Sequence, residues 1–128
     1  HYEWVSEDNT LYIYISDDMV RYDDALKAIL DKKGIEHESR YTGDYYKDIE
    51  VMQKYSNNDL SALVKAGTDS GIICESDYPD GHLRPTRNIS HIDLKRMLSG
   101  IGYDYTYDDK STNKPVTQFE FNKVLENL

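Results

Sequence analysis

Alternating apolar and polar positions near the start of the chain predict a β-strand over residues 10–16. Leu11, Ile13 and Ile15 occupy one set of alternate positions, and tyrosines occupy two of the positions between them. Because apolar side chains fill both faces, we expect this strand to be central in a sheet. Residues 35–41 are short, extended and polar, which indicates a second strand nearer the sheet edge.

A hairpin is predicted in the middle of the chain. Residues 71–75 form an apolar run that is typical of a buried strand. Tyr78–Gly81 has proline and glycine where a β-turn favours them, and residues 82–88 then return as the partner strand. Pro85 within the returning strand places it at an edge or a bulge, because proline has no N–H to donate to a neighbour.

Helical periodicity of the apolar residues, together with N-cap and C-terminal glycine signals, predicts four helices in the first hundred residues. They run from Asp17-Asp18 to Gly34, over residues 44–55, from Leu60 to Gly67, and from Ser90 to Gly100. At the C-terminal end, residues 103–108 and 116–121 are predicted to pair as a second hairpin. A short helix carrying Val124, Leu125 and Leu128 would end the chain.

Three of these segments resemble the glutaredoxin branch of the thioredoxin fold. Leu11–Ser16 resembles its first strand, Ala25–Glu38 its first helix and second strand, and Ser90–Lys95 the start of its last helix. The resemblance implies an α/β fold with a mixed sheet flanked by helices over residues 10–101. Residues 102–128 would then be a hairpin and helix extension of the same single domain.

The functional residues of glutaredoxins are missing from the matching positions. That family has a reactive cysteine at the start of its first helix, where the helix N-terminus favours the thiolate. Here the segment Asp17–Tyr22 contains no cysteine, and its acids would disfavour a thiolate. The family's cis-proline before the third strand is also missing, because Thr68–Gly71 contains no proline. The resemblance therefore implies a degenerate domain that binds a partner rather than one that catalyses redox chemistry.

Composition favours a basic protein partner. The net charge is −9, from 24 acidic and 15 basic residues, and such a surface repels nucleic acid and anionic membranes. The chain has 12 tyrosines, which combine an apolar ring with a polar tip and suit interfaces. With Cys74 as its one cysteine, it has no internal disulfide, which favours a reducing, cytoplasmic setting. The alternatives without a binding role are that the charge only keeps the domain soluble and that the tyrosines only reflect strand propensity.

We therefore predict a non-catalytic, acidic binding protein that engages a basic protein surface and needs no cofactor. Phage-encoded inhibitors and immunity proteins of nucleic-acid-binding enzymes are the sharpest version, because their acids take the place of phosphates. The predicted binding residues are acids and tyrosines near the first helix and in the C-terminal part: Asp17, Asp18, Asp23, Asp24, Tyr103, Asp104, Tyr105, Tyr107, Asp108 and Asp109.

Four alternatives remain open from the sequence. Cys74 could serve a diverged thiol redox enzyme, although a lone cysteine in a strand is more often a small buried hydrophobe. Asp80, Asp93 and Lys95 match a loose nuclease pattern, in which two acids hold Mg²⁺ and a lysine stabilises the phosphate. His82 and His91 with Asp80 could form a metal site. A structural subunit that assembles through its tyrosines is the fourth alternative.

Overall fold

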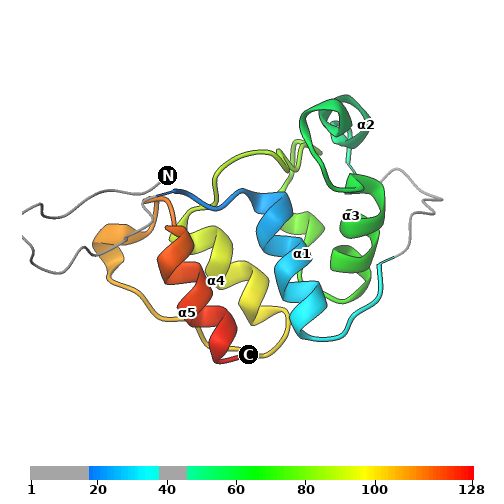
Figure 1. Ribbon diagram of the computed structural model, residues 1–128. Helices are drawn as coiled ribbons and strands as arrows, with labels where there is room; N and C mark the ends of the chain where they lie inside the picture. The colour runs from blue at the N-terminus through cyan, green and yellow to red at the C-terminus, as the bar shows by residue number, and fades with distance from the viewer. Residues whose placement is uncertain (1–17, 38–45) are drawn as a thin grey trace, which may run out of the picture.

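The computed structural model describes residues 18–37 and 46–128, and these ranges contain helices but no β-strand (Figure 1). The elements are α1 (Tyr22–Lys32), α2 (Ile49–Met52), η1 (Gln53–Tyr55), α3 (Leu60–Asp69), η2 (Glu75–Asp77), α4 (His91–Ser99), η3 (Asp109–Ser111) and α5 (Gln118–Glu126). The mixed α/β sheet expected from the glutaredoxin resemblance is therefore wrong for the described residues. The predicted strand over residues 10–16 lies outside them.

Three of the predicted helices are confirmed. α1 buries Leu26, Ile29 and Leu30 on one face, as their helical spacing predicts, but it begins at Tyr22 with Arg21 as its N-cap and not at the predicted Asp17-Asp18 start. α3 begins at its predicted cap, where the Asp59 carboxylate accepts from the Ala62 N–H, but it continues two residues past Gly67. α4 begins with the predicted capping box. The helix predicted over residues 44–55 is shorter than expected, since its described part contains only α2 and η1.

The predicted central hairpin is wrong. Residues 72 and 73 are buried, but they lie in a loop between α3 and η2, and residues 82–88 form an irregular loop. The backbone at Gly71 and Ile72 packs directly on Gly100, where a Cβ would lie 2.1 Å from the Gly71 oxygen. The apolar run thus reflects burial against α4 rather than strand pairing, which periodicity cannot distinguish. Residues 35–37 of the other predicted edge strand form no strand either.

The predicted C-terminal hairpin is also wrong, because residues 118–126 form α5. Thr117 accepts from the Glu120 N–H, and the Glu120 carboxylate accepts from the Thr117 N–H, which is a complete capping box. Phe121 and Val124 are buried, and Leu125 packs beside them. Their spacing is helical, so the strand predicted over residues 116–121 does not form.

A three-way backbone junction joins the starts of α1, α4 and α5. The Val20 N–H donates to the Val116 carbonyl at 3.2 Å, Val116 donates to Ile89 at 3.0 Å, and Ile89 donates back to Val20 at 2.8 Å. Each of the three residues is almost fully buried. Each also directly precedes the N-cap of a helix, Arg21, Ser90 or Thr117. The junction therefore fixes the starting points of three helices relative to one another.

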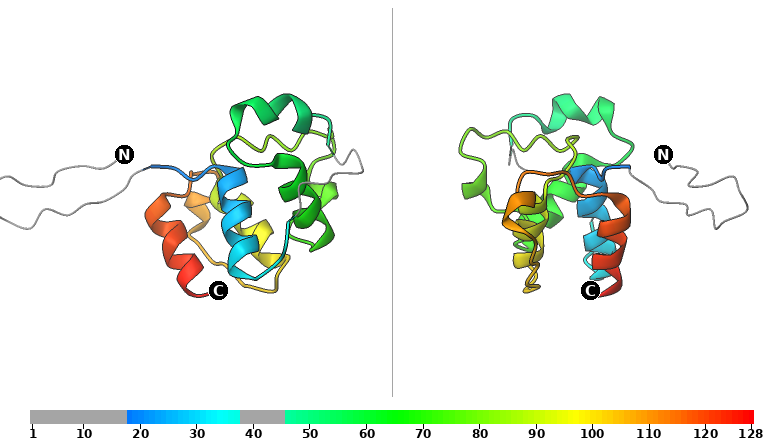
Figure 2. Two further views of the ribbon diagram at one scale, coloured as in Figure 1. Left: turned by 45° about the vertical axis from the view of Figure 1, so that its right-hand side comes forward. Right: turned by 90° about the vertical axis from the view of Figure 1, so that its left-hand side faces the viewer.

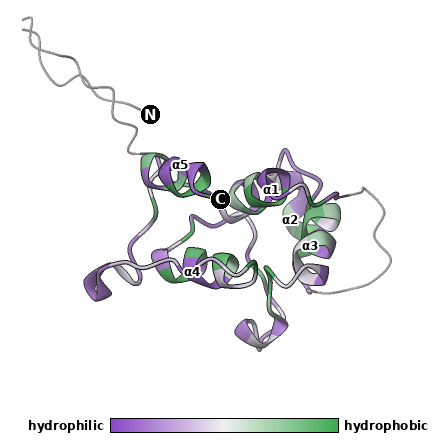
Figure 3. Cartoon of the chain, turned by 90° about the horizontal axis from the view of Figure 1, so that it is seen from below, coloured by the Kyte–Doolittle hydropathy of each residue, from purple (hydrophilic) through white to green (hydrophobic). Residues whose placement is uncertain are grey.

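The helices form two layers around one hydrophobic cluster. α1 packs on α3 and on α5, and the views in Figures 2 and 3 place α4 in a second layer beside this row. The cluster takes side chains from α1, α3, α4 and α5, including Leu26, Leu63, Leu98 and Phe121. None of the described helices is long and apolar enough to cross a lipid bilayer, since the longest, α1, has 11 residues.

Candidate functional site

The segment Tyr103–Asp109, which we call the acidic-aromatic strip, holds most of the residues predicted to bind a partner. Gly102 turns the chain into it with φ +79, a left-handed conformation that glycine adopts without strain. The Tyr103 N–H then donates to a carbonyl in the last turn of α4 at 2.9 Å, and the Lys95 amine donates to the Tyr105 carbonyl at 3.3 Å. These bonds hold the strip beside α4, along which it runs toward η3 (Figure 3).

Burial alternates along the strip. Tyr103, Tyr105 and Tyr107 are half-buried, whereas the residues between them are exposed. Successive side chains of an extended chain face opposite sides, so the rings face the protein and the acids face solvent. In the described part of the chain, neither Asp104 nor Asp108 forms an ion pair with a lysine, arginine or histidine. The strip therefore presents uncompensated carboxylates on a backing of aromatic rings.

His91 anchors the rings of the strip to α4. The side chain of His91 is buried, and its Nδ1 lies 2.8 Å from the Tyr105 hydroxyl oxygen. The His91 ring lies parallel to the Tyr105 ring with centroids 6.1 Å apart, and it also contacts Tyr107 at 5.6 Å. On its other side, Nε2 lies 3.7 Å from the carboxylate of Glu120 in α5. These contacts tie the rings of the strip to α4 and, through His91, to α5.

The negative charge of the strip comes from its aspartates. Burial raises the pKa of the Tyr105 hydroxyl above its ordinary value, and the Glu120 carboxylate and the Tyr107 hydroxyl raise it further. Tyr105 is thus neutral at physiological pH and offers a hydroxyl and a ring face. Asp109 is exposed like Asp104, and the Asp108 carboxylate accepts from the Lys110 N–H at 3.0 Å.

The predicted acids near α1 do not join the strip. Asp17 lies outside the described residues, and the carbonyl of Asp18 accepts from the Gln118 N–H at the start of α5. Asp23 is 1% exposed and serves the fold, because its carboxylate is enclosed by hydrogen-bond donors. Asp24 is exposed, but it is held by the Asn58 amide at 2.9 Å, on the loop between η1 and α3.

Cys74 is exposed rather than buried in a strand. It lies directly before η2, and its Sγ is 3.0 Å from the Ser76 hydroxyl oxygen. The expectation of a buried structural cysteine is therefore wrong, because the strand on which it depended does not form.

The residues of the nuclease pattern are not brought together. Asp80 pairs with Arg84, and this hydrogen bond lowers the Asp80 pKa to about 2. Asp93 pairs with Arg87 at 3.0 Å, and although burial opposes it, this bond holds the Asp93 pKa below its ordinary value. The Lys95 amine instead contacts the strip, since residues two positions apart in a helix lie on different sides.

The histidine pair proposed for a metal site is separated as well. His82 lies in the exposed loop with its Nδ1 4.0 Å from an Asp80 oxygen, whereas His91 is buried beneath the strip. Among residues 18–37 and 46–128, no three histidine, cysteine or acidic side chains are grouped so that they could hold a metal ion.

One spacing pattern was not recognised from the sequence. Oxygen-bearing residues in the η3–α5 loop have the spacing of an EF-hand calcium loop: Asp109, Ser111, Asn113, Pro115, Thr117 and Glu120. The glycine that this loop needs at its sixth position is replaced by Lys114, and φ is not positive there. One oxygen of the Glu120 carboxylate already accepts from Thr117. The structure therefore does not have the calcium-loop geometry.

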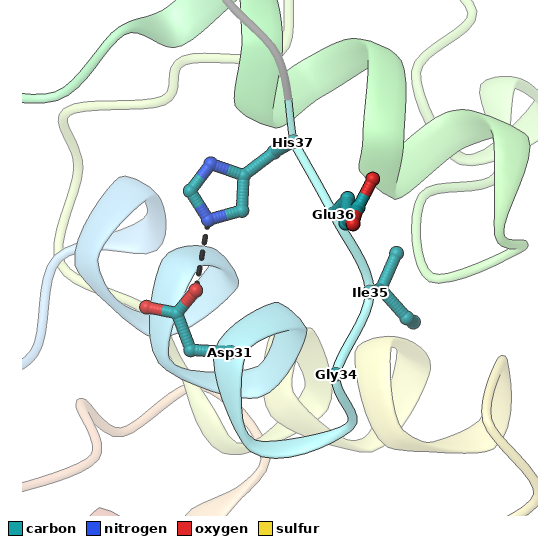
Figure 4. A pocket seen from close by; sticks show the side chains of 5 residues that line it. All are labelled: Asp31, Gly34, Ile35, Glu36 and His37. Atoms are coloured by element: carbon teal, nitrogen blue, oxygen red, sulfur yellow. Dashed lines mark hydrogen bonds and ion pairs between the residues drawn. The ribbon is translucent and has the colours of Figure 1, made fainter.

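Two hollows border other parts of the described chain. One, at the end of α1, is lined by Asp31, Gly34, Ile35, Glu36 and His37 (Figure 4). His37 contacts the Asp31 carboxylate at 2.8 Å, and this contact, with Lys27, lowers the Asp31 pKa. The hollow adjoins residues outside the described range, so we place no site there. The second hollow lies between α2 and the loop at residues 82–87, and it is basic.

Sequence reasoning considered His91 only as a metal ligand and not as the anchor of the strip, and it did not single out Glu120, which contacts His91. The capping-box spacing of Thr117 and Glu120 was the available signal for the second of them. Comparison of the chain with models of known protein families, with curated proteins and with solved structures gives no match.

Proposed function

We propose that this chain is a non-catalytic binding domain whose acidic-aromatic strip engages a basic surface of another protein. The observation that carries the proposal is the combination of exposed, unpaired carboxylates with rings fixed against His91. A surface that is already ordered loses little conformational entropy on binding, so more of the contact energy appears as affinity. Half-exposed tyrosines add anchor area with few rotatable bonds.

The backbone of the strip supports the same proposal. Among the described residues, the N–H groups of Asp104 to Tyr107 donate to no backbone carbonyl. An extended segment with free donors is a template for an added strand from a partner. A partner strand with lysine or arginine at alternate positions would place its cations beside Asp104 and Asp108, because both acids lie on one side of the strip.

The net charge of −9 extends this attraction beyond contact distance. Electrostatic steering raises association rates for an oppositely charged partner and suppresses wrong partners of like charge. We propose a nucleic-acid-binding enzyme as the partner class, with aspartates in the place of phosphates, and a reducing cytoplasmic setting. An inhibitor or immunity protein of such an enzyme is the specific role that we propose.

The test compares two double variants of equal net charge in the full chain. Asp104→Lys with Asp108→Lys reverses the strip, whereas Glu50→Lys with Glu126→Lys reverses two exposed acids on α2 and α5. Fluorescence anisotropy would measure binding to a labelled lysine- and arginine-rich peptide over a range of salt concentrations. We expect the strip variant to bind at least about tenfold more weakly than the control variant, since each variant changes net charge equally.

Two results would contradict the proposal. One is equal affinity of the two double variants, which would mean that only net charge matters. The other is an affinity that does not change with salt, because attraction between exposed charges is screened by ions. Capture experiments with the immobilised chain would then ask whether the retained proteins are basic and whether the strip variant retains fewer of them.

A further inference from the structure

A basic groove lies between α2 and the loop at residues 82–87, away from the strip. Its volume is about 470 Å³, within the range of sites that take a few side chains of a ligand. Lysine, arginine and apolar side chains line it together with a histidine, a threonine and one acid: Lys47, Asp48, Val51, Met52, His82, Arg84, Thr86 and Arg87. Such a lining is unexpected in a chain with a net charge of −9.

The floor of the groove is rigid because of a buried carboxylate. Asp48 precedes α2, and its two oxygens accept from the Leu83 N–H at 3.0 Å and the Arg84 N–H at 2.8 Å. The Thr86 hydroxyl also contacts the Met52 sulfur at 3.6 Å. The loop and α2 are therefore fastened to each other on both sides of the groove.

Arg84 has a backbone conformation that is unfavourable for its side chain. Its φ is +56, and among the described residues it is the one non-glycine residue with a positive φ. Arg87 holds this conformation from behind, because its guanidinium donates to the carbonyls of Leu83 and Arg84 and pairs with Asp93. It also stacks 4.4 Å from the Tyr22 ring centre. A strained residue that its surroundings hold in place is a reason to look for function.

The strained backbone presents a charge that a ligand can reach. The Arg84 side chain is 57% exposed, and its partner Asp80 is also exposed. An exposed pair of this kind contributes little to stability, so a competing carboxylate can replace Asp80 at small cost. In the described part of the chain, no acid forms an ion pair with Lys47, which adds a second available cation.

The apolar half of the groove restricts the kind of ligand. Val51 is 57% exposed, an unusual exposure for a helical valine, and Met52 is half-buried beside it. A free inorganic anion would make no use of these side chains. We propose that the groove binds an acidic peptide segment of a partner protein, with carboxylates at Arg84 and Lys47 and an apolar side chain at Val51 and Met52. This site is independent of the strip and of the function proposed for it.

The test uses the full chain and a labelled peptide in which glutamates alternate with leucines. Fluorescence anisotropy would compare the wild type with Arg84→Gly, because glycine keeps φ +56 without strain but removes the charge. We expect binding about tenfold weaker or worse and a melting temperature at least equal to that of the wild type. Arg96→Gln, which removes an exposed arginine of α4, is the matched control and should bind normally.

Arg84→Asn is the second variant, since asparagine also tolerates a positive φ, and Lys47→Gln tests the other cation. The proposal is overturned if both Arg84 variants fold and bind the peptide as tightly as the wild type. It is also overturned if the wild type does not bind the peptide at low salt, or if a glutamine version of the peptide binds equally well. Displacement by inorganic phosphate at concentrations similar to the peptide would assign the groove to a free anion instead. Self-association that Arg84→Gly abolishes would assign it to a second copy of the chain.

Discussion

Replacing Asp23 tests whether this acid is part of a binding surface, as predicted from the sequence, or stabilises the folded state. Its carboxylate accepts from both the Nε and the Nη2 of Arg21, at 3.1 and 3.0 Å. It also accepts from the Asp24 N–H at 2.9 Å, the Ser56 hydroxyl at 2.5 Å and the Asn58 amide at 3.3 Å. Substitution by alanine would leave the Arg21 Nε, the Asp24 N–H and the Ser56 hydroxyl without this acceptor, whereas the Arg21 Nη2 would keep the Tyr55 carbonyl and the Asn58 amide would keep Asp24.

The size of the effect follows from burial and from the kind of bond. Removing one partner of a buried ion pair costs about 3–5 kcal/mol, because the other charge and the donors remain. The Arg21 side chain is 35% exposed and keeps part of its hydration, so the lower end of that range applies. We expect Asp23→Ala to lower the free energy of unfolding by about 3 kcal/mol and the melting temperature by about 10 °C.

Urea denaturation followed by far-ultraviolet circular dichroism would measure the change, with Asp24→Ala as the control. Asp24 lies next in the sequence and carries the same charge, but it is exposed and is held only by Asn58. Its replacement should cost no more than about 1 kcal/mol. Equal costs for the two variants, or a cost below about 1 kcal/mol for Asp23→Ala, would refute the structural role. Folded Asp23→Ala protein should still bind basic peptide through the strip.

Three further predictions concern packing and pH. Gly100→Ala should lower the free energy of unfolding by about 2 kcal/mol in urea denaturation, because the new Cβ would lie 2.1 Å from the Gly71 oxygen. An increase in stability would contradict this packing. The pKa of Asp93 is lowered in the folded state, so its pairing with Arg87 stabilises the protein above the ordinary pKa of 3.8. This stabilisation is lost as the pH falls through the pKa of the folded state. In Asp93→Asn, the free energy of unfolding should therefore change less with pH on the acid side. Burial, with the nearby Tyr78 hydroxyl, raises the Tyr22 pKa, so stability should fall as the pH rises above 10.0, and Tyr22→Phe should reduce that fall in alkaline melts.

The helices were predictable where local signals and burial agree. Leu26, Ile29 and Leu30 repeat with helical spacing, and Ser90 with Asp93 forms a cap that depends only on neighbouring residues. The strands were not predictable, because an apolar pair such as Ile72 and Ile73 can be buried without pairing. Nothing local distinguishes a strand from a loop pressed against the end of a helix.

The candidate site was predictable in part. Residues 103–108 were predicted as a strand of a hairpin; no strand forms there, but burial alternates between the tyrosines and the residues between them. The sequence did not indicate that this segment lies along α4 instead of pairing in a hairpin, since His91 and Lys95 of α4 hold it there. The basic groove could not be predicted from the sequence either, because Asp48 and Arg84 are far apart in the chain and come into contact only in the folded protein.

The three-way junction of Val20, Ile89 and Val116 has a consequence for how the protein folds. None of the three hydrogen bonds joins neighbouring parts of the chain, so two long loops must close before the ring of bonds is complete. Until the last segment arrives, a buried donor and a buried acceptor on the other two have no partner. Assembly should therefore be cooperative and comparatively slow, and during synthesis the junction cannot form until Val116 has left the ribosome.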